Sequence, residues 1–263
     1  MSWKAKVAGF GSRIAPRAWL SLEIARRNRH FEKEYWLLPQ LCGRDANAVY
    51  VGGNTGLYAY YLSRLVKVVH VFEPNPICLG QLERVRRKNM VIHDVALSDH
   101  RGEAKMRFDP GNEGVGTIEP ANRLDNNPGI RKVVERDVKV CTLDDLNLSN
   151  IAFMKIDVEG HEPSVLRGAT HLLATEKPVL LIEIERRHNA TAYEDVEDLL
   201  KAYGYSSWRL AEGRVVPVSR DQIAQLQVLP MSDGRLYVNN FIFVPPERSE
   251  VLEKLRGQLA ARG

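Results

Sequence analysis

The sequence predicts an α/β fold built on a parallel sheet, and three observations support this fold class. Residues 48–51, 66–72 and 90–97 are short apolar runs rich in β-branched side chains. Apolar residues at helical spacing follow the first two runs, over residues 55–65 and 76–88. Two strands that are each followed by a helix, and then by a further strand, are typical of a parallel sheet. The chain has 263 residues, 44% of them hydrophobic, which is enough for one sizeable core.

The rest of the chain continues this pattern as one domain. Residues 99–102 are expected to form a turn, and residues 103–108 the return strand of a hairpin. Residues 109–130, rich in Gly and Pro, are expected to form a mobile lid over the substrate. Further strands are predicted over residues 133–140, 151–158, 179–185, 205–210 and 237–244, a short turn or helix over residues 143–146, and helices over residues 163–174, 192–203 and 247–261.

Composition excludes several classes of protein. Charged residues make up 27% and aromatic residues 8%, which argues against a disordered chain or a collagen-like chain. No run of 18 apolar residues is present, so no transmembrane helix is expected. Cys42, Cys78 and Cys141 are odd in number and form no CxxC pair, which predicts reduced thiols. The first residues lack the apolar run of a signal peptide, and a cytoplasmic protein is therefore expected.

The N-terminal region has its own charge pattern. Residues 1–47 are expected to form a helical extension that precedes the domain at 48–263, with a helix over residues 18–38. Residues 1–33 carry eight lysines and arginines but only two glutamates, with aromatic and aliphatic residues between them. A basic amphipathic helix favours peripheral contact with an acidic membrane surface or an oligomer partner. A solvated helix that covers the core is the alternative interpretation.

The first chemical signal is the run GGNTG at residues 52–56, between a predicted strand and its helix. Glycines allow the backbone to approach a ligand, and the start of the helix offers free N–H groups. The dinucleotide pattern G-x-G-x-x-G fails, because Asn54 and Leu57 occupy positions that require glycine. The spacing G-x-N-x-G instead favours a ligand with an amino-acid tail.

A second signal is Glu73, which ends the next strand twenty-one residues after Gly52. A carboxylate at this place can accept hydrogen bonds from both hydroxyls of a ribose. Pro74 and Pro76 end the strand and start the following helix. Together with the glycine turn, Glu73 predicts a ligand that contains a nucleoside.

A third signal lies where the strand at 151–158 ends, in the sequence KIDVEGHE. Ligands of open parallel sheets bind outside the carboxyl ends of the strands. A cluster of ionisable groups there predicts a reaction centre, although a well-capped helix start would contain some of the same residues. The cluster consists of Lys155, Asp157, Glu159, His161 and Glu162.

With these motifs the chain resembles the FkbM family of S-adenosylmethionine-dependent methyltransferases. The resemblance covers roughly residues 48–190 and includes the runs GGNTG, FEPN at 72–75, ALSD at 96–99, TLDD at 142–145 and KIDVEGHE at 155–162. The resemblance also includes LRGA at 166–169 and LIE at 181–183. It implies the class I methyltransferase fold, which is Rossmann-like, with a mostly parallel seven-stranded sheet flanked by helices. It also implies S-adenosyl-L-methionine as cofactor and O-methylation of a sugar, polyketide or related natural product, so that the partner is a small-molecule or glycan acceptor.

The resemblance also implies roles for individual residues. Glu73 would hold the ribose, and Ala96 would lie near the adenine. Tyr50 stands where the family usually has an Asp that helps to hold the methionine ammonium. The residues around the methionine end and the transferable methyl would be Gly52, Gly53, Asn54, Gly56, Lys155, Asp157 and Glu159.

Methyl transfer to an alcohol requires a group that accepts the hydroxyl proton. Asp157 is the first candidate, because it ends its strand, and His161 is the second, because its ordinary pKa is about 6.5. Lys155 could orient the substrate hydroxyl or pair with Glu159. No metal is expected, although Asp157, Glu183 and a third acid could bind Mg²⁺.

Two other functions remain open from the sequence. A basic helix face at residues 84–88 and a pI near 8.9 would permit an RNA or DNA methyltransferase. The Asn/Asp-Pro-Pro-Tyr motif of amino methylation is absent, so no nucleic acid is expected as partner. A binding protein that kept the fold and lost the cofactor is the other alternative, and Tyr50 is its support.

Overall fold

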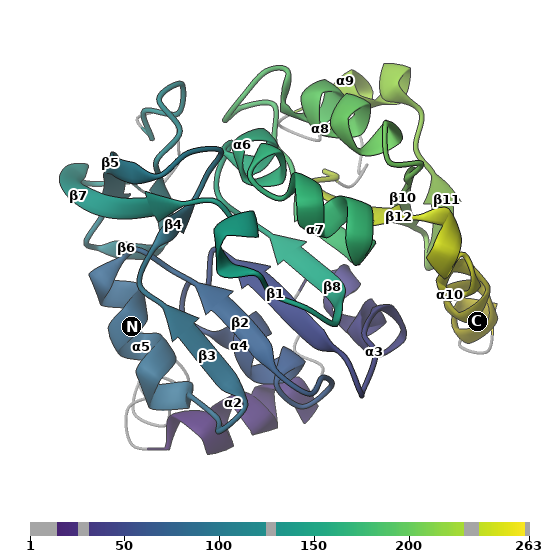
Figure 1. Cartoon of the computed structure of the whole chain (residues 1–263), viewed down its shortest axis with the longest axis horizontal. Coiled ribbons are helices and arrows are strands. Elements are labelled where there is room, and N and C mark those ends of the chain that lie inside the picture. The colour runs from purple at the N-terminus through teal and green to yellow at the C-terminus, as the bar shows by residue number, and fades with distance from the viewer. Residues whose placement is uncertain (1–14, 26–31, 125–129, 229–236, 261–263) are drawn as a thin grey trace.

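A computed structural model describes residues 15–25, 32–124, 130–228 and 237–260. Its main sheet has eight strands in the order β11-β10-β12-β9-β8-β1-β2-β3 (Figure 1). The strands are β1 Asn47–Val51, β2 Val69–Phe72, β3 Met90–His93, β8 Ile151–Ile156, β9 Val179–Glu183, β10 Ser206–Ala211, β11 Arg214–Pro217 and β12 Asn240–Val244.

Strands β3, β2, β1, β8 and β9 are parallel neighbours, and β12 then pairs antiparallel with both β9 and β10. The prediction of a class I, mostly parallel sheet flanked by helices is confirmed. The number of strands is eight, not seven, because β11 folds back on β10. Glu212 and Gly213 make this turn with positive φ angles of 46° and 74°.

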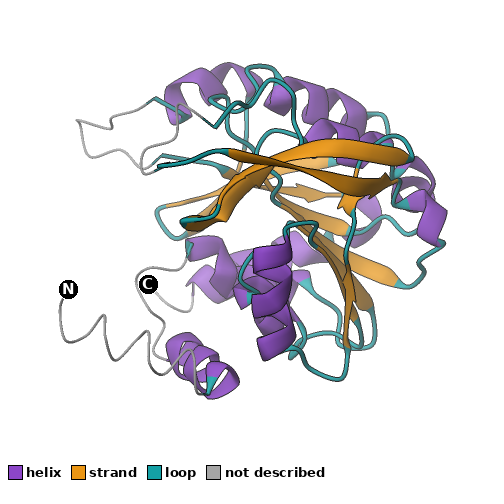
Figure 2. Ribbon diagram, turned by 90° about the vertical axis from the view of Figure 1, so that its left-hand side faces the viewer, coloured by secondary structure: helices purple, strands orange, loops and turns teal. Residues whose placement is uncertain are grey.

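Helices cover both faces of the main sheet (Figure 2). One face packs against α2 Pro16–Ala25, the 3₁₀ helix η1 Lys33–Leu37, α3 Leu38–Leu41, α4 Leu57–Leu62, α5 Pro76–Val85 and α10 Glu250–Ala260. The other face packs against α6 Glu162–Arg167, α7 Thr170–Thr175, α8 Ala192–Lys201 and α9 Ile223–Leu226. All six residues of β8 are buried, as expected for a central parallel strand. Short 3₁₀ turns lie at η2 Asp144–Leu146, η3 Arg220–Gln222 and η4 Pro246–Arg248.

A second sheet of four strands, in the order β4-β7-β5-β6, lies beside α5 (Figure 1). Its strands are β4 Ala96–Leu97, β5 Gly102–Asp109, β6 Asn112–Thr117 and β7 Val134–Cys141. The prediction of a single strand over 90–97 is wrong, since β4 leaves β3 and pairs with β7. The hairpin partner of residues 103–108 is also wrong, because β5 pairs with β6 and β7.

The expected loop at 109–130 is in part a strand. β6 pairs antiparallel with β5, and only residues 125–129 of this segment lie outside the described residues. Gly116 pairs with Phe108 in this ladder, and a Cβ at Gly116 would lie 3.3 Å from Phe108 Cβ. The segment expected to be a lid therefore contains a strand of the second sheet, and its expected hinge at Gly129 lies outside the described residues.

Two predicted helices are shorter than expected. Residues 163–174 divide into α6 and α7 at Gly168, where a Cβ would lie 1.9 Å from the Ser98 carbonyl oxygen. In the predicted helix at 18–38, α2 ends at Ala25 and η1 begins at Lys33, while residues 26–31 lie outside the described residues. Within α2, Ser21 Oγ lies 2.7 Å from the Tyr60 hydroxyl of α4, so this helix covers the core.

Most of the basic N-terminal residues lie outside the described part of the chain, so contact with a membrane or a second subunit stays a prediction. Among the described helices, none combines the length and the apolar character that crossing a bilayer requires. Cys42, Cys78 and Cys141 form no disulfide.

Candidate functional site

A cavity lies at the carboxyl ends of β1, β2 and β8 and is closed on one side by the second sheet. It encloses about 640 Å³, including its open mouth. The carboxyl ends of neighbouring parallel strands meet at this edge, as the sequence analysis expected. The predicted site residues that line the cavity are Gly52, Asn54, Glu73, Ala96, Asp157, Glu159 and His161.

Gly53 and Gly56 do not line the cavity and instead allow close packing beneath it. A Cβ on Gly53 would lie 2.6 Å from Val71 Cγ1, and one on Gly56 would lie 2.7 Å from Val85 Cγ2. Tyr50 is also buried below the turn, with its ring centre 5.8 Å from that of Tyr58. These three predicted cofactor residues therefore belong to the packing beneath the cavity and not to its lining.

Gly52 follows β1 and packs closely against Asp157, which follows the neighbouring strand β8. Its φ of +85° lies in the left-handed region, and a Cβ would be 1.9 Å from the Asp157 carbonyl oxygen. The Asp157 amide donates a 3.0 Å hydrogen bond to the Val51 carbonyl, which holds the two chain segments together. A side chain at Gly52 would thus displace Asp157 from its place beside the turn.

We expect Gly52→Ala to lower the free energy of unfolding by about 2 kcal/mol, because it adds overpacking to an unfavourable φ. Gly213→Ala is the matched control, since Gly213 has a φ of +74° and a Cβ there would meet no atom within 4 Å. The control should cost about 1 kcal/mol, from the φ angle alone. Urea denaturation measures both variants, and equal losses would contradict the close approach to Asp157.

Glu73 is held at the end of β2 by two backbone groups. Its carboxylate accepts hydrogen bonds from the amides of Asn54, at 2.7 Å, and Asn75, at 2.8 Å. Asn75 caps α5 through its side chain, which accepts a hydrogen bond from the Ile77 amide. Burial raises the pKa of Glu73 to about 7, so a ligand that donates hydrogen bonds to it would favour its charged form.

Asp157 follows β8 and has a side chain that is 25% exposed at the cavity. Burial raises the pKa of this carboxyl to about 6, and the neighbouring Lys155 ammonium limits the rise. A carboxylate with this pKa is both charged and basic near neutral pH. Asp157 is therefore suited to accept a proton from a bound hydroxyl.

Lys155 is fully buried and does not line the cavity. Its Nζ donates to Asn240 Oδ1 at 3.0 Å and lies 3.8 Å from Asp157 Oδ2 and 3.7 Å from Glu183 Oε2. Glu159 instead lies beside His188, with 3.0 Å between Oε2 and Nε2. Lys155 thus pairs with Asp157 and Glu183 instead of with Glu159, and acts on the cavity through Asp157.

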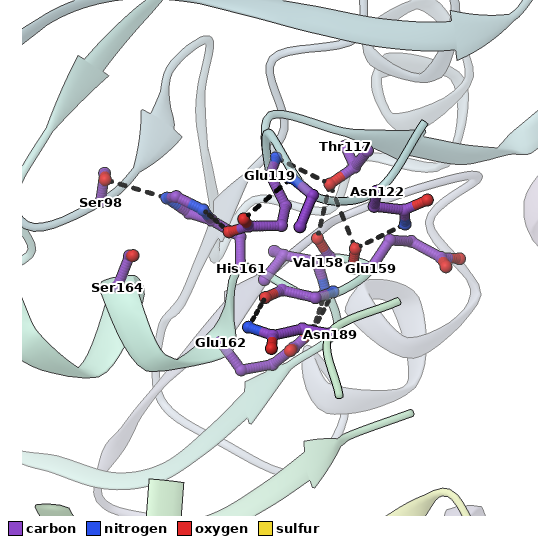
Figure 3. A network of polar contacts seen from close by, with 12 residues as sticks. Ser98, Thr117, Glu119, Asn122, Val158, Glu159, His161, Glu162, Ser164 and Asn189 are labelled. Atoms are coloured by element: carbon purple, nitrogen blue, oxygen red, sulfur yellow. Dashed lines mark hydrogen bonds and ion pairs between the residues drawn. The ribbon is translucent and has the colours of Figure 1, made fainter. Parts of the chain in front are cut away.

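His161 has contacts at both ring nitrogens (Figure 3). Nε2 lies 2.9 Å from Ser98 Oγ, and Nδ1 lies 3.0 Å from Glu119 Oε2. The hydrogen bond from His161 lowers the pKa of Glu119. To act as a base, the imidazole would have to give up one of these contacts, whereas Asp157 would not.

Glu119 belongs to a segment, residues 117–124, that we call the strap. Thr117 Oγ1 donates to the carbonyls of Val158 and Glu159 at 3.4 and 3.2 Å, and Asn122 Nδ2 donates to the Glu159 carbonyl at 2.7 Å (Figure 3). Thr117 also lines the cavity. The strap therefore ties the second sheet to the loop that follows β8 and forms one wall of the site.

The sequence analysis missed the residues that hold His161 and the strap in place, Ser98, Glu119 and Asn122. Ser98 lies in the ALSD run that supported the family resemblance, so a signal for it existed. Glu119 and Asn122 lie in the segment expected to be a lid, and their partners are 42 and 37 residues away. No local pattern indicated those contacts.

We expect Glu119→Ala to open the strap locally, because it removes the contact with His161. The loss of about 1 kcal/mol should raise amide hydrogen exchange of residues 117–124 about fivefold. Glu103→Ala is the control, since Glu103 is exposed on β5 of the same sheet. Unchanged exchange in the strap, or the same change in both variants, would show that Glu119 does not secure it.

The described residues contain no group of three or more His, Cys, Asp or Glu side chains arranged to hold a metal ion. The suggested ligands Asp157 and Glu183 both face the Lys155 ammonium. The Lys155 ammonium thus occupies the position beside both carboxylates that a bound metal ion would take.

Residues 47–207 match a family described as the methyltransferase FkbM domain. "Methyltransferase 1" of Beauveria bassiana (strain ARSEF 2860) is 29% identical over 178 residues, which are 58% of this chain and 69% of that protein. A crystal structure of methyltransferase FkbM from Methylobacillus flagellatus KT is 18% identical, with a TM-score of 0.48. That match covers 76% of this chain but only 43% of the other, so this chain spans less than half of that protein. A putative methyltransferase from Streptococcus mutans, solved in complex with SAH, is 11% identical with a TM-score of 0.44, over 81% of this chain and 94% of that one.

Proposed function

The chain belongs to the FkbM methyltransferase family, and from this premise we propose that it methylates a hydroxyl group with S-adenosylmethionine as donor. The acceptor would be a sugar, a polyketide or a related small molecule or glycan. One observation supports the proposal above all: Glu73 and Asp157 face the same cavity from the ends of β2 and β8. In this proposal one carboxylate would bind the nucleoside and the other would accept a proton.

The residues present fit S-adenosylmethionine. Gly52 lines the cavity and carries no side chain, so its backbone can approach the ligand there. Glu73 presents a carboxylate to ribose hydroxyls, and Ala96 with Leu97 offers an apolar surface to the adenine. S-adenosylmethionine, when bound, supplies an electrophilic methyl group on a sulfonium.

The chain's own residues would position the acceptor and remove its proton. The acceptor hydroxyl must lose its proton as the new C–O bond forms, and the Asp157 carboxylate is available to accept it. Lys155 keeps Asp157 charged, since an adjacent cation favours the ionised form. Thr117 and Ile118 of the strap line this side of the cavity together with His161, and they would exclude water from it once the ligands are bound.

Calorimetry with S-adenosylmethionine and S-adenosylhomocysteine tests the first half of the proposal, namely whether the protein binds the methyl donor. Saturable binding of both compounds is expected. Transfer of a trideuterated methyl group to a panel of sugars and polyketides, followed by mass spectrometry, tests the second half. Absence of binding would support a non-catalytic protein. Label found in RNA or DNA instead of small molecules would support the nucleic-acid alternative.

A further inference from the structure

The N-terminal region brings two carboxylates, Glu32 and Glu34, close enough to the strand-end site for their charges to act on Lys155. The hydroxyl of Tyr58, on α4, donates a 2.5 Å hydrogen bond to Glu32 Oε2. Glu32 precedes residue 47, where the match to the family begins. The described part of the N-terminal region thus supplies a charged side chain to the neighbourhood of the site.

Tyr58 connects this carboxylate to Lys155. Lys155 Nζ lies 5.4 Å from the centre of the Tyr58 ring, on its face, and 3.8 Å from Asp157 Oδ2. A cation over a tyrosine ring is attracted by the ring, and the attraction is stronger where water is excluded. A continuous line of contacts therefore runs from Glu32 through Tyr58 and Lys155 to Asp157.

The position of the Lys155 ammonium has chemical consequences. Nζ is shared between Asp157 and Glu183, at nearly equal distances of 3.8 and 3.7 Å. A small movement of the ammonium would favour one carboxylate over the other, because charge interactions are strong where water is excluded. The Tyr58 ring lies on one side of the ammonium, and it is held by packing against Tyr35 and Tyr50 and by the hydrogen bond of its hydroxyl to Glu32.

We propose that Glu32 is a positioning residue that acts through Tyr58 and Lys155, and by its own charge, on the ionisation of Asp157. The inference rests on the proposed role of Asp157 as the proton acceptor. Removing the negative charge of Glu32 would make Asp157 easier to ionise. The charged and titratable groups that influence Asp157 from the surrounding elements are Lys155, Glu159 and Glu162 from β8 and the loop after it, Glu183 and Glu185 from β9, Glu73 from β2, Tyr50 from β1, and Glu32.

The test follows the carboxyl signal of Asp157 by ¹³C NMR during a pH titration of the full chain, with the signal assigned by its loss in Asp157→Asn. Glu32→Gln should lower the titration midpoint of Asp157 by about half a pH unit, because a nearby negative charge is lost. Glu32→Asp keeps the charge and should lie closer to the wild type. Glu83→Gln is the matched control, since Glu83 is exposed on α5 and pairs with Arg86.

Tyr58→Phe is a second variant in case Glu32→Gln does not fold. It removes the hydrogen bond that holds Glu32, and should lower the midpoint in the same direction by a smaller amount. An unchanged midpoint in folded Glu32→Gln, or an equal shift in Glu83→Gln, would overturn the inference. The titration uses neither cofactor nor acceptor, so its failure is distinct from a failure of the proposed function.

Discussion

Replacing Asp157 by Asn is expected to lower the turnover of methyl transfer by about 10²–10⁴-fold, the usual contribution of a general base. Asn has nearly the same shape but cannot accept the proton. Affinity for S-adenosylmethionine should change little, because the Gly52 turn contacts the backbone of Asp157 and not its carboxylate. Single-turnover kinetics with the acceptor found in the labelling screen, together with calorimetry, separate the two effects.

The pH dependence of turnover gives a second measure of this role. The pKa of Asp157 is about 6, and only the ionised carboxylate can accept a proton, so turnover should fall as the pH drops through about 6. A histidine base would give a similar loss of turnover at low pH, so the variants are needed to distinguish the two bases. Asp137→Asn, at an exposed aspartate of β7, is the control. A larger loss in His161→Gln than in Asp157→Asn would contradict the assignment.

Replacing Glu73 by Ala is expected to weaken S-adenosylmethionine binding by about 1.5–3 kcal/mol, or roughly 10- to 100-fold in Kd, the scale of hydrogen bonds to a charged group. Binding should also weaken as the pH falls below about 7, because protonation of Glu73 removes its charge. Calorimetry at pH 6 and pH 8 measures both effects.

Asn75→Ala provides the matched control for Glu73→Ala. It removes the cap of α5 and should cost about 1 kcal/mol of stability, but it leaves the Glu73 carboxylate in place. Asn75 also lines the cavity, but its side-chain oxygen is occupied by the Ile77 amide, so the effect of the substitution on Kd should be small. An equal loss of affinity in Asn75→Ala would mean that the order of the loop, and not the carboxylate, governs binding.

The site residues that follow parallel strands could be predicted from the sequence. Gly52, Glu73 and Asp157 each stand at the end of a parallel strand, and such ends share one edge whatever the details of packing. The burial of Lys155 was not predictable, because its partner Asn240 is 85 residues away on β12. The contact between His161 and Glu119 depends on a second sheet, and the Gly-rich β6 carries little of the β-branched pattern that marks a strand.

The insertion of β12 between β9 and β10 has a consequence for how the chain is made. Five parallel strands can assemble once residue 183 has left the ribosome, but the edge of β9, with the sequence VLLIE, then has no neighbour on one side. An apolar edge strand of this kind readily pairs with other chains. The same strand β12 delivers Asn240 to the buried Lys155, so the last of the described strands to emerge both covers the exposed edge and completes the polar support of Asp157. Nascent chains that stop before residue 240 should therefore depend on a chaperone to remain soluble, and synthesis of β12 is the step that assembles the site.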